Sequence, residues 1–445
     1  MSAESTPRRA LSFDSNPPFS VPMRFFFSAV LFAILASAVL IWQGEAALLS
    51  RWSPSTLALT HLLVLGCLSM AMLGALLQML PVVAGISLPQ VERLGPLVHL
   101  GLCAGTLLLA SAFWWQIPAL FIGAAGLLAA TLLLFLGACS IGLWRTPAAG
   151  ATEVVSAIRH ALSALLATLT LGLVLVATLA LPQFAHLPWQ RLTDLHVLWG
   201  LLGWVGLLVM GIAWQVVPMF MVTEPYPPAL RRHFSSALFL LLCASSVASA
   251  LLPPAHWSTR VTEASLMAGC AAFASVTLYL LAHRKRPSAD TTTLYWRYAM
   301  LCVLLASLLA TLPLDWPLNF RPLALGVLMI AGVAMSAIYG MLYKIVPFLT
   351  WYHLQETRTR GQSVPTLHQI IPAQNGRWQF GLHATGVLLL LAACYAPAAL
   401  SVPAGAVMAL ASSTMLWNLL TALRLYRRLQ YHAHADDAVT TSHSG

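Results

Sequence analysis

The chain has 445 residues, of which 59% are hydrophobic and only 8% are charged, and its net charge is +10. Soluble domains are about a quarter charged, so this composition excludes an ordinary soluble protein and indicates a polytopic membrane protein. The positive charge does not call for a nucleic-acid partner, because short segments that flank apolar runs carry it.

Twelve apolar segments are long enough to be membrane-spanning helices, which need about 20 residues. The first follows a polar lead of 23 residues and lacks a small-residue cleavage site, so we interpret it as a span and not as a removed signal. The predicted spans are 24–43, 55–83, 95–116, 118–144, 158–181, 194–221, 234–253, 262–283, 296–313, 322–350, 379–399 and 402–425.

Arginine and lysine collect on one face of this twelve-span topology, which the positive-inside rule makes cytoplasmic. We therefore expect a bacterial-type inner-membrane protein with both termini in the cytoplasm. The cytoplasmic face carries Arg8, Arg9, Arg93, Arg145, Arg159, Arg231, Arg232, Arg284, Lys285, Arg286, Arg358, Arg360, Arg424, Arg427 and Arg428. The opposite face carries only Arg51, Arg191, Arg260 and Arg321.

A nine-residue phrase with the pattern Gly-x3-Gln/Lys-x2-Pro occurs three times, at 74–82, 211–219 and 340–348. The copies begin 137 and 129 residues apart, and each closes a long apolar run. Such a period predicts three related helical units within one membrane domain. Glycine in this phrase allows close helix packing.

Other features recur with a similar period. The first helix of each unit begins at a basic residue (Arg24, Arg159, Arg297), and the third carries a histidine near its start (His99, His233, His383). Four helices per unit make the units parallel repeats around an axis along the membrane normal. We predict a pseudo-threefold all-α protein with units at about 24–145, 158–286 and 296–428. We expect segment 355–378 to be a cytoplasmic loop. We expect the two ends of the chain, 1–20 and 430–445, to be flexible tails.

Twelve helices in three four-helix arcs, with His61 on the second helix, resemble the catalytic subunit of heme–copper oxidases. The segment from His61 to Pro81 is also similar to the second helix of the NnrS family. Members of that family are heme- and copper-containing membrane proteins tied to nitric oxide metabolism. The resemblance implies an oxidase subunit I-like fold, with heme b as a cofactor and copper as a second candidate.

The chain also departs from both patterns. Its seventh helix has only His233, its tenth has no histidine, and Leu62 to Leu65 follow His61 where the NnrS pattern has His-x-His-Glu-Met. We therefore expect a divergent member in which some cofactor sites are lost.

His61 and His196 are the strongest candidates for heme or metal ligands. Both lie about six residues or fewer inside their helices, in the outer third of the bilayer, and neutral imidazole ligates heme iron and copper. Gly200 and Gly203 share a helical face with His196 and leave room for a flat macrocycle. The alternative is that each histidine is a buried polar group bonded to a neighbouring helix.

The spacing of the two histidines complicates a symmetric pair. His61 lies 13 residues before Gly74, whereas His196 lies 15 before Gly211, and two residues rotate a helix by roughly 200°. Either a local distortion restores the direction, or the two histidines serve different sites. Asp194 can support His196 only if the chain there is not helical.

His99 and His383 are further cofactor-binding candidates, with interfacial or helix-contact roles as the alternative. Gln78, Gln215 and Lys344 occupy one position of the repeat, where they can bond carbonyls freed by the following proline. Lys344 can also neutralise a carboxylate, a heme propionate or a lipid.

The two histidines favour a heme-binding protein, and the resemblance implies a redox or nitric-oxide-related role. An enzyme of this kind would be an oxidoreductase acting on nitric oxide or oxygen. Two alternatives stay open: a transporter or channel for a metal, heme or small substrate through the ring, and a cofactor-free scaffold or assembly factor. The expected partners are the lipid bilayer and a redox protein or other membrane subunits, with no nucleic acid.

Overall fold

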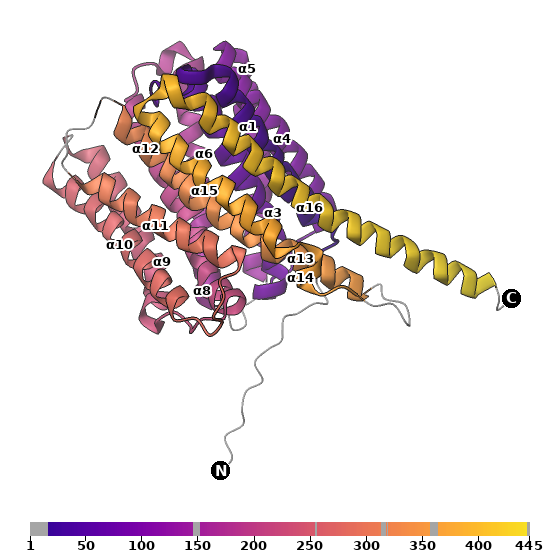
Figure 1. Cartoon of the computed structure of the whole chain (residues 1–445). Helices are drawn as coiled ribbons and strands as arrows, with labels where there is room; N and C mark the ends of the chain where they lie inside the picture. The colour runs from indigo at the N-terminus through magenta and orange to yellow at the C-terminus, as the bar shows by residue number, and fades with distance from the viewer. Residues whose placement is uncertain are drawn as a thin grey trace.

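In the computed structural model the chain forms a bundle of helices (Figure 1). The structure describes residues 17–145, 152–253, 256–312, 317, 319–356 and 364–442. No strand occurs in these ranges. The elements are α1 (Ser20–Gln43), η1 (Gly44–Leu48), α2 (Pro54–His61), η2 (Leu62–Ser69), α3 (Met70–Ala84), α4 (Val91–Trp115), α5 (Pro118–Arg145), α6 (Thr152–Ala180), η3 (Pro182–Phe184), α7 (Trp189–Leu198), η4 (Trp199–Gly206), α8 (Leu207–Met221), α9 (Pro228–Leu251), α10 (Trp257–Ala282), α11 (Thr291–Thr311), α12 (Phe320–Val327), η5 (Leu328–Met335), α13 (Ser336–Glu356), α14 (Leu367–Ile370), α15 (Ala373–Tyr395) and α16 (Pro397–Ser442).

Twelve helical runs in the described chain are long and apolar enough to cross a membrane, which confirms the prediction of a multi-pass membrane protein. Large aromatic side chains are exposed at their ends. Trp42, Trp115 and Trp257 are 65–71% exposed at one side of the bundle, and Trp144 is 91% exposed at the other. Aromatic belts of this kind are typical of the two membrane–water interfaces.

The second, sixth and tenth spans share an uncommon backbone feature, a π-helical segment between two α-helical parts. These segments are η2, η4 and η5. Each begins twelve residues before the glycine of the repeated phrase and ends five residues before it. Because π-helix is rare in proteins, the same distortion at the same position shows that the three helices have equivalent local structure.

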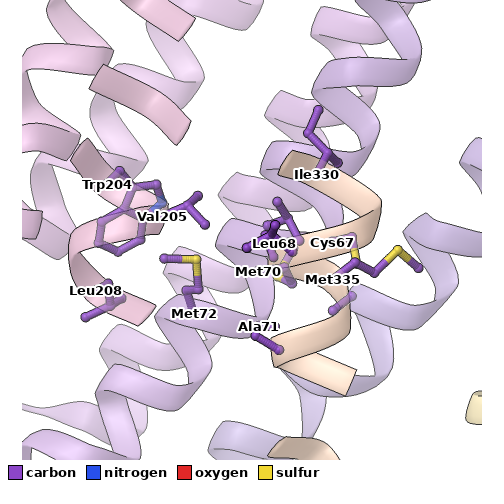
Figure 2. Close-up of a cluster of buried hydrophobic side chains, with 14 of the residues drawn as sticks. Cys67, Leu68, Met70, Ala71, Met72, Trp204, Val205, Leu208, Ile330 and Met335 are labelled. Atoms are coloured by element: carbon purple, nitrogen blue, oxygen red, sulfur yellow. The ribbon is translucent and has the colours of Figure 1, made fainter. Parts of the chain in front are cut away.

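The three π segments meet inside the bundle, where η5 contacts both η2 and η4. Trp204 on η4 donates its indole N–H to Ser69 Oγ on η2 over 3.0 Å. Apolar side chains fill the region around this bond (Figure 2). All are buried: Cys67, Leu68, Met70, Ala71, Met72, Trp204, Val205, Leu208, Ile330 and Met335.

The glycine of each phrase packs against the first helix of its predicted unit. A Cβ atom added at the glycine would lie only 2.2–2.7 Å from a Cβ of that helix, so no side chain fits there. This agrees with the packing role predicted for the glycines. The contacts are Gly74 with Phe25, Gly211 with Ala157 and Gly340 with Tyr295.

The prolines of the phrase lie inside their helices, although each phrase closes a long apolar run in the sequence. Pro81 and Pro218 lie inside α3 and α8, three residues before the helix ends, and Pro347 lies well inside α13. Proline removes one intrahelical hydrogen bond, and neighbouring helices stabilise the chain enough for it to continue.

The predicted alignment of the basic entries is only partly right. Arg159 and Arg297 each lie two residues after the residue that packs on the phrase glycine, and each guanidinium donates to a carbonyl 16 residues earlier, Leu143 or Leu281. Arg24 lies one residue before Phe25 and donates to Ser20 O in its own helix. The first unit therefore departs from the other two at this position.

Two segments predicted to be irregular contain helix. The chain from Gln430 to Ser442 continues α16, since no glycine or proline interrupts it. The predicted loop 355–378 contains α14, where Thr366 and Gln369 form a capping box, and the start of α15. Residues 1–16, 357–363 and 443–445 of these segments lie outside the described residues.

Candidate functional site

A cavity of about 1590 Å³ lies in the half of the bundle opposite the face predicted to be cytoplasmic. Its wall is mostly apolar and comes from helices of all three predicted units, including α1, α6, α10 and α12. His61 and His196 both line it. The two strongest candidates from the sequence therefore share one site.

The imidazole rings of His61 and His196 face each other, with centroids 6.3 Å apart and planes inclined by 27°. His61 also stacks on Phe113 of α4, with centroids 5.0 Å apart. Phe113 was not a sequence candidate, because nothing near it in the chain marks it. It fixes the His61 ring from the side of the third helix.

Backbone carbonyls orient both rings. Nδ1 of His61 donates to Leu57 O over 2.8 Å, and Nδ1 of His196 donates to Thr168 O of α6 over 3.1 Å. A carbonyl only accepts, so the proton of each neutral imidazole lies on Nδ1 and the lone pair on Nε2. Metal-ligating histidines typically bind a carbonyl or carboxylate through the other nitrogen in this way.

Glycines make room for His196, but not all of those that the sequence indicated. A Cβ at Gly172 of α6 would lie 3.1 Å from His196 Cε1, so this glycine admits the ring. Gly200 lines the cavity as predicted. Gly203 instead packs on α6, where its Cβ would lie 2.8 Å from Ala164 Cβ.

The unequal spacing of the histidines turns out to favour a shared site. Side chains at equivalent positions of helices that are related by rotation about one axis meet only where they point at that axis. The roughly 200° offset of two residues turns one side chain back toward the other. Neither explanation drawn from the sequence is needed: the π segments are in equal register, and the rings meet in one cavity.

Four charged side chains line the cavity: Arg51, Arg260, Glu263 and Arg321. The three arginines are among the four that the topology places on the outer side, and they precede or begin spans there. Asp194 lies in helical α7 and pairs with Arg51 over 2.7 Å. It therefore does not support His196, because a residue two positions away on a helix points elsewhere.

His99 and His383 are not brought to this cavity. Nε2 of His99 lies 2.8 Å from Ser28 Oγ, and Nε2 of His383 lies 2.8 Å from Ser336 Oγ. His383 is fully buried among Tyr295 and Tyr339. The contacts match the alternative interpretation, in which these histidines join neighbouring helices.

The three polar residues of the repeated phrase also lie away from the cavity wall. Gln78 is buried on α3, and Gln215 is half-buried on α8. Lys344 binds Asp290 Oδ2 over 2.7 Å. Its partner is therefore a carboxylate of the chain itself, which is one of the partners expected from the sequence. Asp290 also caps α11, accepting from Thr293 N over 2.9 Å.

Lys344→Met is expected to destabilise the protein by about 1–3 kcal/mol, because it leaves a partly buried carboxylate without its cation. Lys344 and Asp290 are 18% and 32% exposed. The matched control is Lys285→Met, whose pair with Glu224 is 68% and 64% exposed and contributes about 0–1 kcal/mol. Thermal unfolding in detergent measures both; equal effects would contradict the assignment.

The same pair predicts a pH dependence. Burial raises the pKa of Asp290, but the hydrogen bond and charge of Lys344, with two bonds from Thr293, bring the pKa below its ordinary 3.8. A carboxyl with a lowered pKa stabilises the fold above its unfolded value and loses that contribution as pH falls through the folded value. Lys344→Met should therefore lower the melting temperature near neutral pH and have little effect once Asp290 is protonated.

Comparison with known proteins adds no relative: no family model matches the chain, and no curated protein matches it. Among the residues that the structure describes, no group of three or more His, Cys, Asp or Glu side chains is placed to hold a metal ion. The candidate site is thus defined by its own geometry, two facing imidazoles in a large apolar cavity with arginines at its outer end.

Proposed function

We propose that the chain is an inner-membrane heme protein that binds heme b between His61 and His196 and serves in electron transfer. The observation that carries the proposal is the facing pair of imidazoles, each with Nδ1 bonded to a carbonyl. The oxidase subunit I-like ring of three units, and cytoplasmic termini, belong to the same proposal. The three equivalent π-bearing helices support it.

The distance between the rings fits two axial ligands of one metal ion. Metal–imidazole bonds of about 2 Å on opposite sides place the ring centroids roughly 6 Å apart, and the observed separation is 6.3 Å. A heme needs only two protein ligands, because its macrocycle supplies the others. A non-heme ion usually takes three or four, so the donor set favours heme.

The cavity suits a large, flat, amphipathic group. At about 1590 Å³ it exceeds the usual range of roughly 300–1,000 Å³ for small-molecule sites, whereas a bare ion needs no such space. Arg51, Arg260 and Arg321 at its outer end provide donors for anionic groups such as propionates. Copper remains a second candidate cofactor, since two imidazoles also suit Cu(I).

The ligand set favours electron transfer over chemistry on a small gas molecule. Bound heme would supply one-electron redox chemistry, and because His61 and His196 would both hold it, it would not be free to take up nitric oxide or oxygen. What the chain contributes is orientation, through Leu57 and Thr168, and exclusion of water by an apolar wall. A redox partner or another membrane subunit would then exchange electrons with it.

The buried cluster of Figure 2 counts against a channel through the centre of the ring. Apolar side chains of the second, sixth and tenth spans fill this region, and Leu68 and Met70 are fully buried. A cofactor-free scaffold does not account for two half-buried imidazoles that line one cavity and are both held in the ligating tautomer.

Purification from a heme-replete host tests the proposal. We expect a Soret band, a pyridine hemochrome of heme b and about one heme per chain. Elemental analysis of the same sample shows whether copper is bound in addition to heme or in its place. A chain that carries neither heme nor copper would falsify the proposal and favour the transporter or scaffold alternatives.

A further inference from the structure

The span formed by α6 is the least packed of the candidate membrane spans in the described chain. Of the twelve candidate spans, the one formed by α6 has the smallest buried share, 17%. Its inner half has an ordinary buried face that includes Val155, Ile158 and Leu162. From Ala167 to Thr178 no residue is buried, and all but Thr170 are half-buried.

The missing packing lies on the side that faces the cavity. Thr168, Leu169, Gly172 and Val176 line it, with the 3–4 residue spacing of one helical face. Near the outer end of the helix, Leu173, Leu175, Thr178 and Leu179 line it as well. Ser163, Leu166 and Thr170 are exposed on the opposite face, which in a membrane faces lipid. Over this half, a single helix therefore separates the cavity from the bilayer.

The same helix holds one of the two facing histidines. Thr168 O accepts the bond from His196 Nδ1, and Gly172 gives that ring its space. A displacement of the outer half of α6 would open the cavity to lipid and, at the same time, break the hydrogen bond between His196 Nδ1 and Thr168 O. Return of the helix would close the wall and restore the ligand.

We infer that the outer half of α6 is a lateral portal, through which a flat lipophilic molecule with an anionic group enters the cavity from the outer part of the bilayer. The apolar lining favours a molecule that partitions into lipid, and Arg260 and Arg321 select for an anionic end. The inference rests on the proposed function, in which heme is that molecule.

A reversible crosslink tests the portal. A Cβ at position 200 would lie 3.4 Å from Thr168 Cγ2, close enough for a disulfide in the double variant Thr168→Cys/Gly200→Cys. The bond would pin α6 to η4. The control pair, Gly101→Cys/Thr131→Cys, joins α4 to α5, where a Cβ at 101 would lie 3.2 Å from Thr131 Cβ.

Hemin uptake by heme-free protein in nanodiscs is followed at the Soret band before and after reduction of the disulfide. We expect the oxidised Thr168/Gly200 pair to take up hemin at least about tenfold more slowly than the reduced form, as for a locked lid, and the control pair to show no such change. Equal rates would overturn the portal alone. A wild-type chain that takes up no hemin overturns the proposed function and the portal together.

A second measurement needs no engineered disulfide. Hemin is presented to the wild-type protein either in donor vesicles that exchange with the nanodiscs or on albumin in the aqueous phase. Entry from the bilayer predicts that uptake follows the hemin content of the membrane. Uptake that follows only the aqueous concentration would place the entrance at the charged outer end.

Discussion

Alanine in place of His61 or His196 is expected to reduce heme binding by more than about 100-fold, or to leave a weakly held, five-coordinate heme. Each substitution removes one of two axial donors, and loss of a mere supporting residue already costs about 10–100-fold. The two variants should behave alike, because the proposal gives the two histidines the same role and their rings are neighbours, with centroids 6.3 Å apart. Heme-to-protein ratio and the visible spectrum of the purified variants measure the effect.

His99→Ala is the matched control for these variants. His99 is also a histidine inside a membrane helix, but it bonds to Ser28 and does not line the cavity. We expect its heme content to equal that of the wild type. A Soret band left intact by both His61→Ala and His196→Ala would rule out the ligand assignment.

Gly211→Ala adds only one methyl group, but it should destabilise the fold strongly. The new Cβ would lie 2.2 Å from Ala157 Cβ and 3.5 Å from its Cα, so α6 and α8 must move apart. Overpacking of this kind costs about 1–3 kcal/mol, which outweighs the gain of up to about 1 kcal/mol in helix propensity.

Two further variants make the test specific. Ala157→Gly removes the opposing methyl group, so the double variant Gly211→Ala/Ala157→Gly should recover most of the lost stability. Gly137→Ala is the control, because nothing lies within 4 Å of its added Cβ, and it should be neutral or stabilising. Unfolding in mild detergent measures all four proteins; equal effects at 211 and 137 would contradict the packing role.

The number of spans and the repeated phrase could be read from the sequence, because long apolar runs and shared residues are visible in one dimension. The π segments could not be predicted. Apart from a glycine at the fifth position of each (Gly66, Gly203 and Gly332), η2, η4 and η5 share little sequence, and their apolar character is the same as that of an α-helix. The helical continuation of α16 to Ser442 does not follow from composition, because polar residues occur in exposed helices as well as in flexible tails.

The sequence identified His61 and His196 by their depth in the membrane, but it could not show that they meet. Their convergence depends on how the second and sixth spans are turned, which follows from packing of helices far apart in the chain. Phe113 and Gly172 were missed for the same reason. The outer arginines were a usable signal: they are rare on that face, and three of the four line the cavity.

The electron paramagnetic resonance spectrum of the oxidised wild-type protein tests the central claim most directly, because the spin state of ferric heme reports its axial ligands. Heme held between His61 and His196 is six-coordinate, so the account predicts a low-spin ferric signal typical of two imidazole ligands. A purely high-spin signal, or a low-spin signal that persists without change in both His61→Ala and His196→Ala, would contradict it.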